Sequence, residues 1–216
     1  MSLFVTQKMR GKMTGFKSLN TSPMGNSYCD RMSQNPANIC SKCYSRKMVQ
    51  AFECDQRWIE NGNILKKRGA LIATHQLPKL TGIDYFRFHS HGELINSHHL
   101  INLCIIAWEY PDTTFALWSK RKDIIKVAKL WDNSDKVILQ GRKIIPPNLV
   151  LMYSDPKINS LSTRIPLGFD KKFTVFTKEF AKENNIEINC GGKRCMECLL
   201  CYDKNNGVKY INEHLK

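Results

Sequence analysis

Short apolar segments alternate with amphipathic segments through the middle of this chain, and this alternation constrains the fold more than any other feature. Segments rich in β-branched and aromatic residues predict strands from Tyr85 to a break at Gly92 and over 113–119, 148–154 and 172–177. Apolar residues at helical spacing follow the first two of these strands, and a capping threonine follows the last. Alternating strands and helices are typical of a parallel sheet built from βα units. The sequence therefore predicts an α/β fold.

The length of the chain limits how this sheet can close. A full barrel of eight βα units takes about 250 residues, whereas this chain has 216 residues and spends about 80 of them on two cysteine-containing segments. We expect a partial (β/α) barrel or an open, mostly parallel sheet with cysteine-rich metal-binding segments at both ends. The chain is predicted to be a single domain with a basic cysteine-containing segment at 1–48, a βα core at 49–185 and a cysteine-cluster tail at 186–216.

The segments that flank the predicted strands have weaker signals. Residues 1–28 show little periodicity and predict loops with one short strand at most. After Cys43, apolar periodicity predicts a helix that the sequence NGN at 61–63 interrupts. His98 and His99 open the next helix, and we expect both at the surface.

The charge of the chain is strongly basic, with 33 Lys and Arg residues against 19 Asp and Glu residues and a net charge of +14. Half of this excess lies in the first 48 residues, where eight basic residues accompany a single acidic one, Asp30. A nucleic acid or a nucleotide would be a suitable partner. A solvated basic surface, or compensation of an anionic cluster, explains the same charge. The sequence has no basic stripe with interleaved aromatic residues and no helix-turn-helix or RNA-recognition signature.

We expect a soluble protein of the cytoplasm. Lys8 and Arg10 precede any apolar run, which predicts that no secretory signal is present. The longest apolar run, 103–108, is too short to span a bilayer, so no membrane partner is expected. In the cytoplasm, nine cysteines are more typical of metal ligands or free thiols than of disulfides. The sequence does not indicate an oligomeric state.

Four cysteines lie close together in the tail with the spacing C-x4-C-x2-C-x2-C: Cys190, Cys195, Cys198 and Cys201. Structural zinc sites commonly use two separated pairs of ligands. Four thiolates within twelve residues suit the corners of a [4Fe-4S] cluster better, with zinc and a chance cluster of buried thiols as alternatives. Lys193 and Arg194 would offset the negative charge of a thiolate-bound cluster.

A second group of cysteines, Cys29, Cys40 and Cys43, has the spacing C-x10-C-x2-C. Taken alone, the C-x2-C pair also fits a zinc knuckle or a redox dithiol. Three ligands on a [4Fe-4S] cluster leave one iron open, and an open position is what metal chemistry needs. Cys54 is either a fourth ligand or a residue on a helix face, whereas Cys104 is expected in the core. The sequence thus predicts one or two [4Fe-4S] clusters.

A candidate catalytic set lies at the end of the first predicted core strand. Side chains of a strand alternate with period two, which predicts that Arg87, His89 and His91 share a face, with Gly92 and Glu93 at the strand end. Arg87, His89, His91 and Glu93 could bind a metal, transfer protons or hold a carboxylate or phosphate. Alternatively, one histidine is a core residue and the other is exposed. The next strand ends in polar residues that suit either an anionic ligand or helix capping: Ser119, Lys120 and Arg121.

Three motifs in this order resemble the phage-encoded gene product eighty-eight family. They are CSKCYSRK at 40–47, FRFHSHGELINSHHLINLCIIAWEYPDTTFALWSK at 86–120 and CGGKRCMECLLCYD at 190–203. The resemblance covers nearly the whole chain. It implies a phage or prophage origin, and hence the cytoplasm of a host cell, but it implies no particular reaction.

A Cys-x-x-Cys-Tyr element followed by a Gly-Glu strand end is also similar to the radical S-adenosylmethionine superfamily. This resemblance implies that the N-terminal cysteine group holds the reactive cluster and that Gly92 and Glu93 lie near the amino group of S-adenosylmethionine. Tyr44, directly after the last cysteine, is a further candidate for the cofactor site. The first gap between the cysteines is ten residues here, where the superfamily usually has three.

Three functions are consistent with these features. The first is an iron–sulfur enzyme with a radical S-adenosylmethionine-like core that acts on a nucleotide, nucleic acid or protein. The second is a non-catalytic basic module, stabilised by iron–sulfur clusters or zinc, that binds nucleic acid or a host protein. The third is a hydrolase that uses His89, His91 and Glu93, with the cysteines purely structural.

Overall fold

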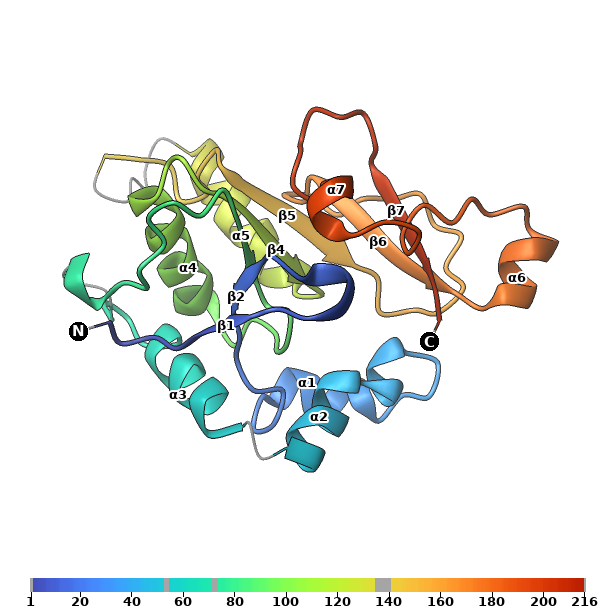
Figure 1. Ribbon diagram of the computed structural model, residues 1–216, viewed down its shortest axis with the longest axis horizontal. Coiled ribbons are helices and arrows are strands. Elements are labelled where there is room, and N and C mark those ends of the chain that lie inside the picture. The colour runs from blue at the N-terminus through green and yellow to red at the C-terminus, as the bar shows by residue number, and fades with distance from the viewer. Residues whose placement is uncertain (1, 53–54, 71–73, 135–140, 216) are drawn as a thin grey trace.

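The computed structural model describes residues 2–52, 55–70, 74–134 and 141–215, which form one seven-stranded sheet (Figure 1). The strands are β1 (Thr6–Lys8), β2 (Lys17–Leu19), β3 (Tyr85–Phe88), β4 (Thr114–Ser119), β5 (Leu149–Ser154), β6 (Lys171–Phe176) and β7 (Tyr210–His214). They lie in sequence order, with β1 and β7 at the edges. β1 is antiparallel to β2, and every other neighbouring pair is parallel. The predicted α/β fold with a mostly parallel sheet is confirmed.

The helices of the described residues are α1 (Ser27–Ser33), α2 (Tyr44–Phe52), α3 (Asp55–Leu65), α4 (Ser97–Glu109), α5 (Lys122–Asn133), α6 (Lys178–Glu183) and α7 (Cys195–Cys198). Three short 3-10 turns accompany them: η1 (Gly11–Met13), η2 (Ile39–Lys42) and η3 (Thr74–Gln76). Within this part of the chain, no helix combines the length and the hydropathy that crossing a bilayer requires.

One face of the sheet packs against α4 and α5. Alternate residues of the central strands, such as Phe88 on β3 and Phe115 on β4, are fully buried on this face, and their rings stack with centroids 5.0 Å apart. They contact an apolar helix stripe that includes Leu103 and Ile125. Burying one such side chain contributes about 1.5–3 kcal/mol. This face therefore holds the main hydrophobic core, and Cys104 lies in it, fully buried, as predicted.

The opposite face of the sheet is covered by segments that carry little secondary structure. Ala116 and Val150 face this side and pack with Phe16 and Tyr202, whose rings stack with centroids 4.9 Å apart. Figure 1 shows α7 beside β6 and β7 and away from α4 and α5. The cysteine-containing tail thus covers the face that the core helices leave open.

Both ends of the chain contribute strands whose positions were not predicted. β2, within the segment expected to be mostly loop, pairs in parallel with β3, and β7, within the tail, pairs in parallel with β6. Each of the three predicted segments of the chain therefore supplies at least one strand to the same sheet.

Two predictions about helices are wrong. The sequence NGN at 61–63 does not interrupt α3, because Asn61 is buried and its side chain bonds the backbone before β1 and after β2, donating to the carbonyl oxygens of Val5 and Asn20. His99 is fully buried rather than exposed, whereas His98 is half-buried.

Candidate functional site

The N-terminal cysteine group lies over the carboxyl ends of the parallel strands. Cys29 belongs to α1, Cys40 belongs to η2, and Cys43 follows η2 directly. The caps of these elements fasten them to the sheet. Asn26 accepts a hydrogen bond from the Tyr28 amide at 3.1 Å, and its own amide group donates to the Glu93 carbonyl oxygen at 3.1 Å.

The far side of this loop is fastened to the end of β5. The Ile39 amide donates to the Pro156 carbonyl oxygen at 2.8 Å, and Asn38 forms an isolated bridge with Lys157. The segment that carries the three thiols is therefore fastened on one side by the Asn26 side chain and on the other by backbone contacts beyond β5.

A buried lysine faces these three thiols. Burial raises the pKa of the Cys29 and Cys40 thiols, and the charge of Lys120 opposes this shift in both. Burial alone would lower the pKa of Lys120, but the charges of Cys40, Glu93, Cys29 and Cys43 together raise it above its ordinary value. Lys120 Nζ donates to Ser154 Oγ at 3.2 Å, so the ammonium is held at the end of β5. The loop is thus a thiol-rich pocket with a fixed positive charge.

Gly92 and Glu93 lie between the end of β3 and the segment after β2 that carries Cys29, Cys40 and Cys43, called the cysteine loop below. Gly92 has a φ of +96°, and a Cβ at this position would overlap the Thr21 side chain and backbone carbonyl group. Glu93 is buried and accepts hydrogen bonds from Ser119 Oγ at 2.6 Å and from the Lys120 amide at 2.8 Å. Both positions need the residue that the sequence has: glycine for the close approach and a carboxylate for its buried donors.

The two predicted catalytic histidines do not share a strand face with Arg87, and this prediction is wrong. β3 ends at Phe88, and His89 has a φ of +59°, which turns its side chain toward α4. There the Nε2 atoms of His89 and His99 are 3.2 Å apart. Burial, followed by the charge of Arg87, lowers the pKa of His89 to about 3, which keeps this ring neutral.

His91 has a different environment. Its ring stacks on Trp58 with centroids 4.4 Å apart, and its Nδ1 atom is 3.0 Å from Ser45 Oγ. Burial, again followed by Arg87, lowers the pKa of His91 to about 4. Tyr44 packs on the same ring with its centroid at 5.1 Å and donates its hydroxyl to the Ser90 carbonyl oxygen. These contacts fix the position of α2 beside the end of β3, and they give His91 a packing role.

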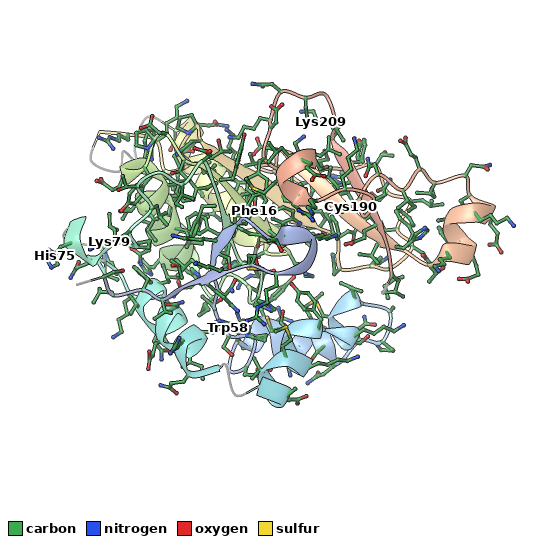
Figure 2. All side chains as sticks on the ribbon, viewed as in Figure 1. Phe16, Trp58, His75, Lys79, Cys190 and Lys209 are labelled. Atoms are coloured by element: carbon green, nitrogen blue, oxygen red, sulfur yellow. The ribbon has the colours of Figure 1, made fainter. Side chains whose placement is uncertain are left out.

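The C-terminal cysteine group lies on the open face of the sheet. The Cys190 amide donates to the Asn212 carbonyl oxygen of β7 at 3.0 Å, α7 carries Cys195 and Cys198, and Cys201 follows after Leu199, which ends the helix with a φ of +49°. Cys190, labelled in Figure 2, lies close to α7.

Two basic side chains face the C-terminal thiols. Lys12 forms an ion pair with Glu213 and places its Nζ 3.4 Å from Cys190 Sγ. Burial raises the pKa of Cys195 and raises that of Cys201 to about 12, and the charge of Arg87 opposes the shift in both. Burial also raises the pKa of Cys190, which Lys12 opposes. Protonated, buried thiols of this kind are unlike the acidic thiol of a redox dithiol.

Both cysteine groups line one cavity with a volume of about 880 Å³. Seven cysteines contribute to its wall: Cys29, Cys40, Cys43, Cys190, Cys195, Cys198 and Cys201. The three positions predicted for a cofactor, Tyr44, Gly92 and Glu93, line it as well. The eight cysteines that the structure describes are free thiols, and Cys54 lies outside the described residues.

No group of three or more His, Cys, Asp or Glu side chains in the described ranges is arranged around a single ion position. The ligands of a cubane cluster bind different irons, so their sulfur atoms are not expected to converge on one point. The arrangement therefore has the ligand types of a cluster site, spread around a shared cavity.

Some residues of the site carried a signal in the sequence and others did not. The position of Lys120 in the sequence suits either an anionic ligand or helix capping, and the structure places this side chain facing the thiols. Lys12 was counted only as part of the basic segment, although together with Lys42 and Arg46 it lines the cavity. Trp118 was missed, although strand alternation places it on the side opposite Leu117, where it lies under Arg87 with the guanidinium carbon 3.8 Å from the ring centroid.

Comparisons with known proteins identify the family but no activity. Searches of curated proteins and of solved structures return no significant match. A family model described as Gene product 88 matches residues 8–212, which span all seven strands except the start of β1 and the end of β7. The match thus covers both cysteine groups, the Gly92–Glu93 strand end and the cavity between them, and the chain belongs to the phage gene product 88 family.

Proposed function

We propose that this chain is an iron–sulfur protein that holds a [4Fe-4S] cluster at each cysteine group and uses the N-terminal cluster together with S-adenosylmethionine. The observation that supports this proposal is that all seven cysteines of the two groups line one cavity. Four thiolates complete the ligand set of a cubane cluster, whereas three leave one iron free for another ligand. The N-terminal group is therefore the candidate reactive centre.

The residues around the N-terminal group suit a cluster. Cys29, Cys40 and Cys43 lie close enough for the charge of each of the last two to act on the first. Thiolate ligands and cluster sulfides carry negative charge, and the buried ammonium of Lys120 offsets it. Lys12 and Arg87 have the corresponding position beside the C-terminal group.

The position of the N-terminal group also suits catalysis. Functional residues of parallel βα folds collect at the carboxyl edge of the sheet, and this group lies there with Gly92 and Glu93. When bound, the cluster would supply the electron that cleaves the carbon–sulfur bond of S-adenosylmethionine. Gly92 and Glu93 would border the cofactor at the strand end, and Tyr44 would border it on the α2 side.

Metal analysis after anaerobic purification tests the proposal. Two cubane clusters require about eight irons and eight sulfides per chain. Cys40→Ala and Cys198→Ala should each remove about half of the iron, because each variant breaks one ligand set. Cys104→Ala is the matched control, since this cysteine is buried in the core away from the cavity, and its iron content should equal that of the wild type. A colourless protein that contains zinc would contradict the proposal.

Addition of S-adenosylmethionine tests the reactive role of the N-terminal cluster. The cofactor should change the electron paramagnetic resonance spectrum of the reduced protein and of Cys198→Ala, but not that of Cys40→Ala. If the wild-type spectrum does not change and the cofactor is not cleaved, the clusters have another role.

The alternative is a non-catalytic, metal-stabilised basic module that binds nucleic acid or a host protein. The net charge of +14 favours it. Retention on double-stranded DNA that falls steeply with salt, in a protein whose spectra do not respond to S-adenosylmethionine, would support this alternative.

A further inference from the structure

The guanidinium of Arg87 points into the cavity from the floor formed by the sheet. Arg87 lies on β3 between Phe86 and Phe88, which face the opposite side and pack in the main core. Because strand residues alternate, Arg87 lines the cavity. Its guanidinium carbon lies 3.8 Å from the ring centroid of Trp118 on the neighbouring strand β4. The ring packs against one face of the guanidinium, and both side chains line the cavity.

Arg87 has unused capacity to bind an anion. None of the five ion pairs found in the described part of the chain includes it. Its Nη1 donates to the thioether sulfur of Met13 at 3.3 Å, which is a weak acceptor, and its Nε is buried without a hydrogen-bond partner. A guanidinium has five N–H donors in a planar fork, and leaving a buried donor such as Nε without an acceptor is costly.

Part of the cavity floor is apolar, and the one carboxylate on β7 that lines it, Glu213, is paired with Lys12. Phe173 and Val175 of β6 and Ile211 of β7 line the same space as Arg87. A cavity of about 880 Å³ has the size of a small-molecule site. The floor therefore pairs one charged donor fork with a surface suited to the carbon skeleton of a ligand.

We propose that Arg87 binds the carboxylate or phosphate group of a small organic anion, which is the substrate held between the two cysteine groups. Arg87 supplies two parallel N–H donors to the anion, Trp118 holds the fork in place, and the apolar floor contacts the rest of the molecule. The identification of this anion as the substrate rests on the proposed function, whereas its binding does not.

The competing explanation is that Arg87 only offsets the charge of the C-terminal thiolates, because it lies near Cys195 and Cys201. The two explanations predict different effects of Arg87→Gln. Loss of a counter-ion would change the iron content or the reduction potential and leave anion binding as it was. Loss of an anion site would weaken anion binding.

Fluorine NMR on the anaerobically purified protein tests the proposal, with iron and sulfide measured on the same samples. The probes are monofluorophosphate and fluoroacetate, which separate a phosphate site from a carboxylate site. We expect the signal of at least one probe to broaden and inorganic phosphate or acetate to reverse the broadening. Arg87→Gln should weaken binding by about tenfold or more. The matched control is Arg142→Gln, since Arg142 lies over Trp108 at 5.3 Å but is exposed and outside the cavity wall.

The outcomes separate the anion site from the proposed function. No broadening with wild-type protein, or equal binding by wild type and Arg87→Gln, would overturn the anion site. Zinc or no metal in a sample that still binds the probe through Arg87 would overturn the proposed function alone. If Arg87→Gln does not fold, Arg87→Lys keeps the charge without the fork and should still bind the probe more weakly than wild type.

Discussion

Replacement of Gly92 by alanine tests how the cysteine loop is joined to the sheet. Gly92 has a φ of +96°, and a Cβ on it would overlap the Thr21 Oγ1 and carbonyl oxygen and lie 2.8 Å from the Thr21 carbonyl carbon. The same two segments are joined by a hydrogen bond from the Thr21 amide to the His91 carbonyl oxygen, with a donor–acceptor distance of 3.2 Å. An added methyl group would therefore push the start of the cysteine loop away from the end of β3.

The magnitude follows from two separate costs. An L-residue in the left-handed region costs about 1–2 kcal/mol. Overpacking typically costs a further 1–3 kcal/mol or so, and here the obstacle is backbone that no rotamer change can move. We expect Gly92→Ala to lower the free energy of unfolding by about 2–5 kcal/mol. If the N-terminal group holds a cluster as proposed, displacement of the loop should also lower its iron content.

Equilibrium unfolding in urea, followed by circular dichroism, measures the stability change. The matched control is Gly82→Ala, since Gly82 has a φ of +74° but no atom lies within 4 Å of the position that its Cβ would take. This variant carries only the conformational cost of about 1–2 kcal/mol. Thr21→Ala in the Gly92→Ala background should restore little stability, because the carbonyl group of Thr21 stays in place. Equal destabilisation by Gly92→Ala and Gly82→Ala would refute the argument.

Three further predictions concern the surroundings of the cavity. Asn26→Ala should lose about 1–2 kcal/mol of stability together with N-terminal iron, whereas Thr177→Ala, which removes the N-cap of α6, should lose about 1 kcal/mol in urea unfolding and no iron. The pKa of His91 in the folded protein is about 4, below its ordinary value of 6.5, so on acidification the unfolded chain takes up a proton first and the free energy of unfolding should fall as the pH drops from 6.5 toward 4. In urea unfolding at several pH values, His91→Gln should reduce the slope of this fall by up to about 1.4 kcal/mol per pH unit. An unchanged slope would contradict a neutral His91 ring. If the C-terminal group holds a cluster as proposed, Lys12→Met should lower its midpoint potential in a redox titration, because a nearby positive charge favours the more negative reduced cluster. An unchanged potential would show that the charge of Lys12 does not act on the cluster.

The central strands could be predicted because they are short runs rich in apolar, β-branched and aromatic residues. Phe86 and Phe88 face the helices while Arg87 faces the cavity, as period two requires. The two cysteine groups could also be found, since their spacing is a local property of the sequence. The contacts that a side chain makes with distant parts of the chain are not a local property, and the prediction that His89 and His91 share a strand face with Arg87 is wrong for this reason.

The burial of His99 shows the physical reason for this failure. The position of His99 in the first turn of α4 suggests exposure, and the alternation of β3 suggests that His89 shares a strand face with Arg87. The left-handed conformation of His89, with a φ of +59°, reverses both expectations by turning one ring toward the other. A non-glycine residue rarely adopts this conformation, and although histidine adopts it more often than most residues, the sequence pattern of the segment does not indicate it.

The meeting of the two cysteine groups depends on the strand that was hardest to predict. β7 (Tyr210–His214) contains an asparagine, a glutamate and a histidine, and its pairing with β6, rather than its own propensity, explains why it is a strand. Because β6 and β7 are parallel, the chain between them must return from the carboxyl edge of the sheet to the amino edge. α4 and α5 occupy one face, so this return, which carries Cys190 to Cys201, covers the other. The parallel register of β7 thus brings the tail cysteines beneath the N-terminal group, which the loop after β2 holds at the carboxyl edge, and a shared cavity follows from that topology.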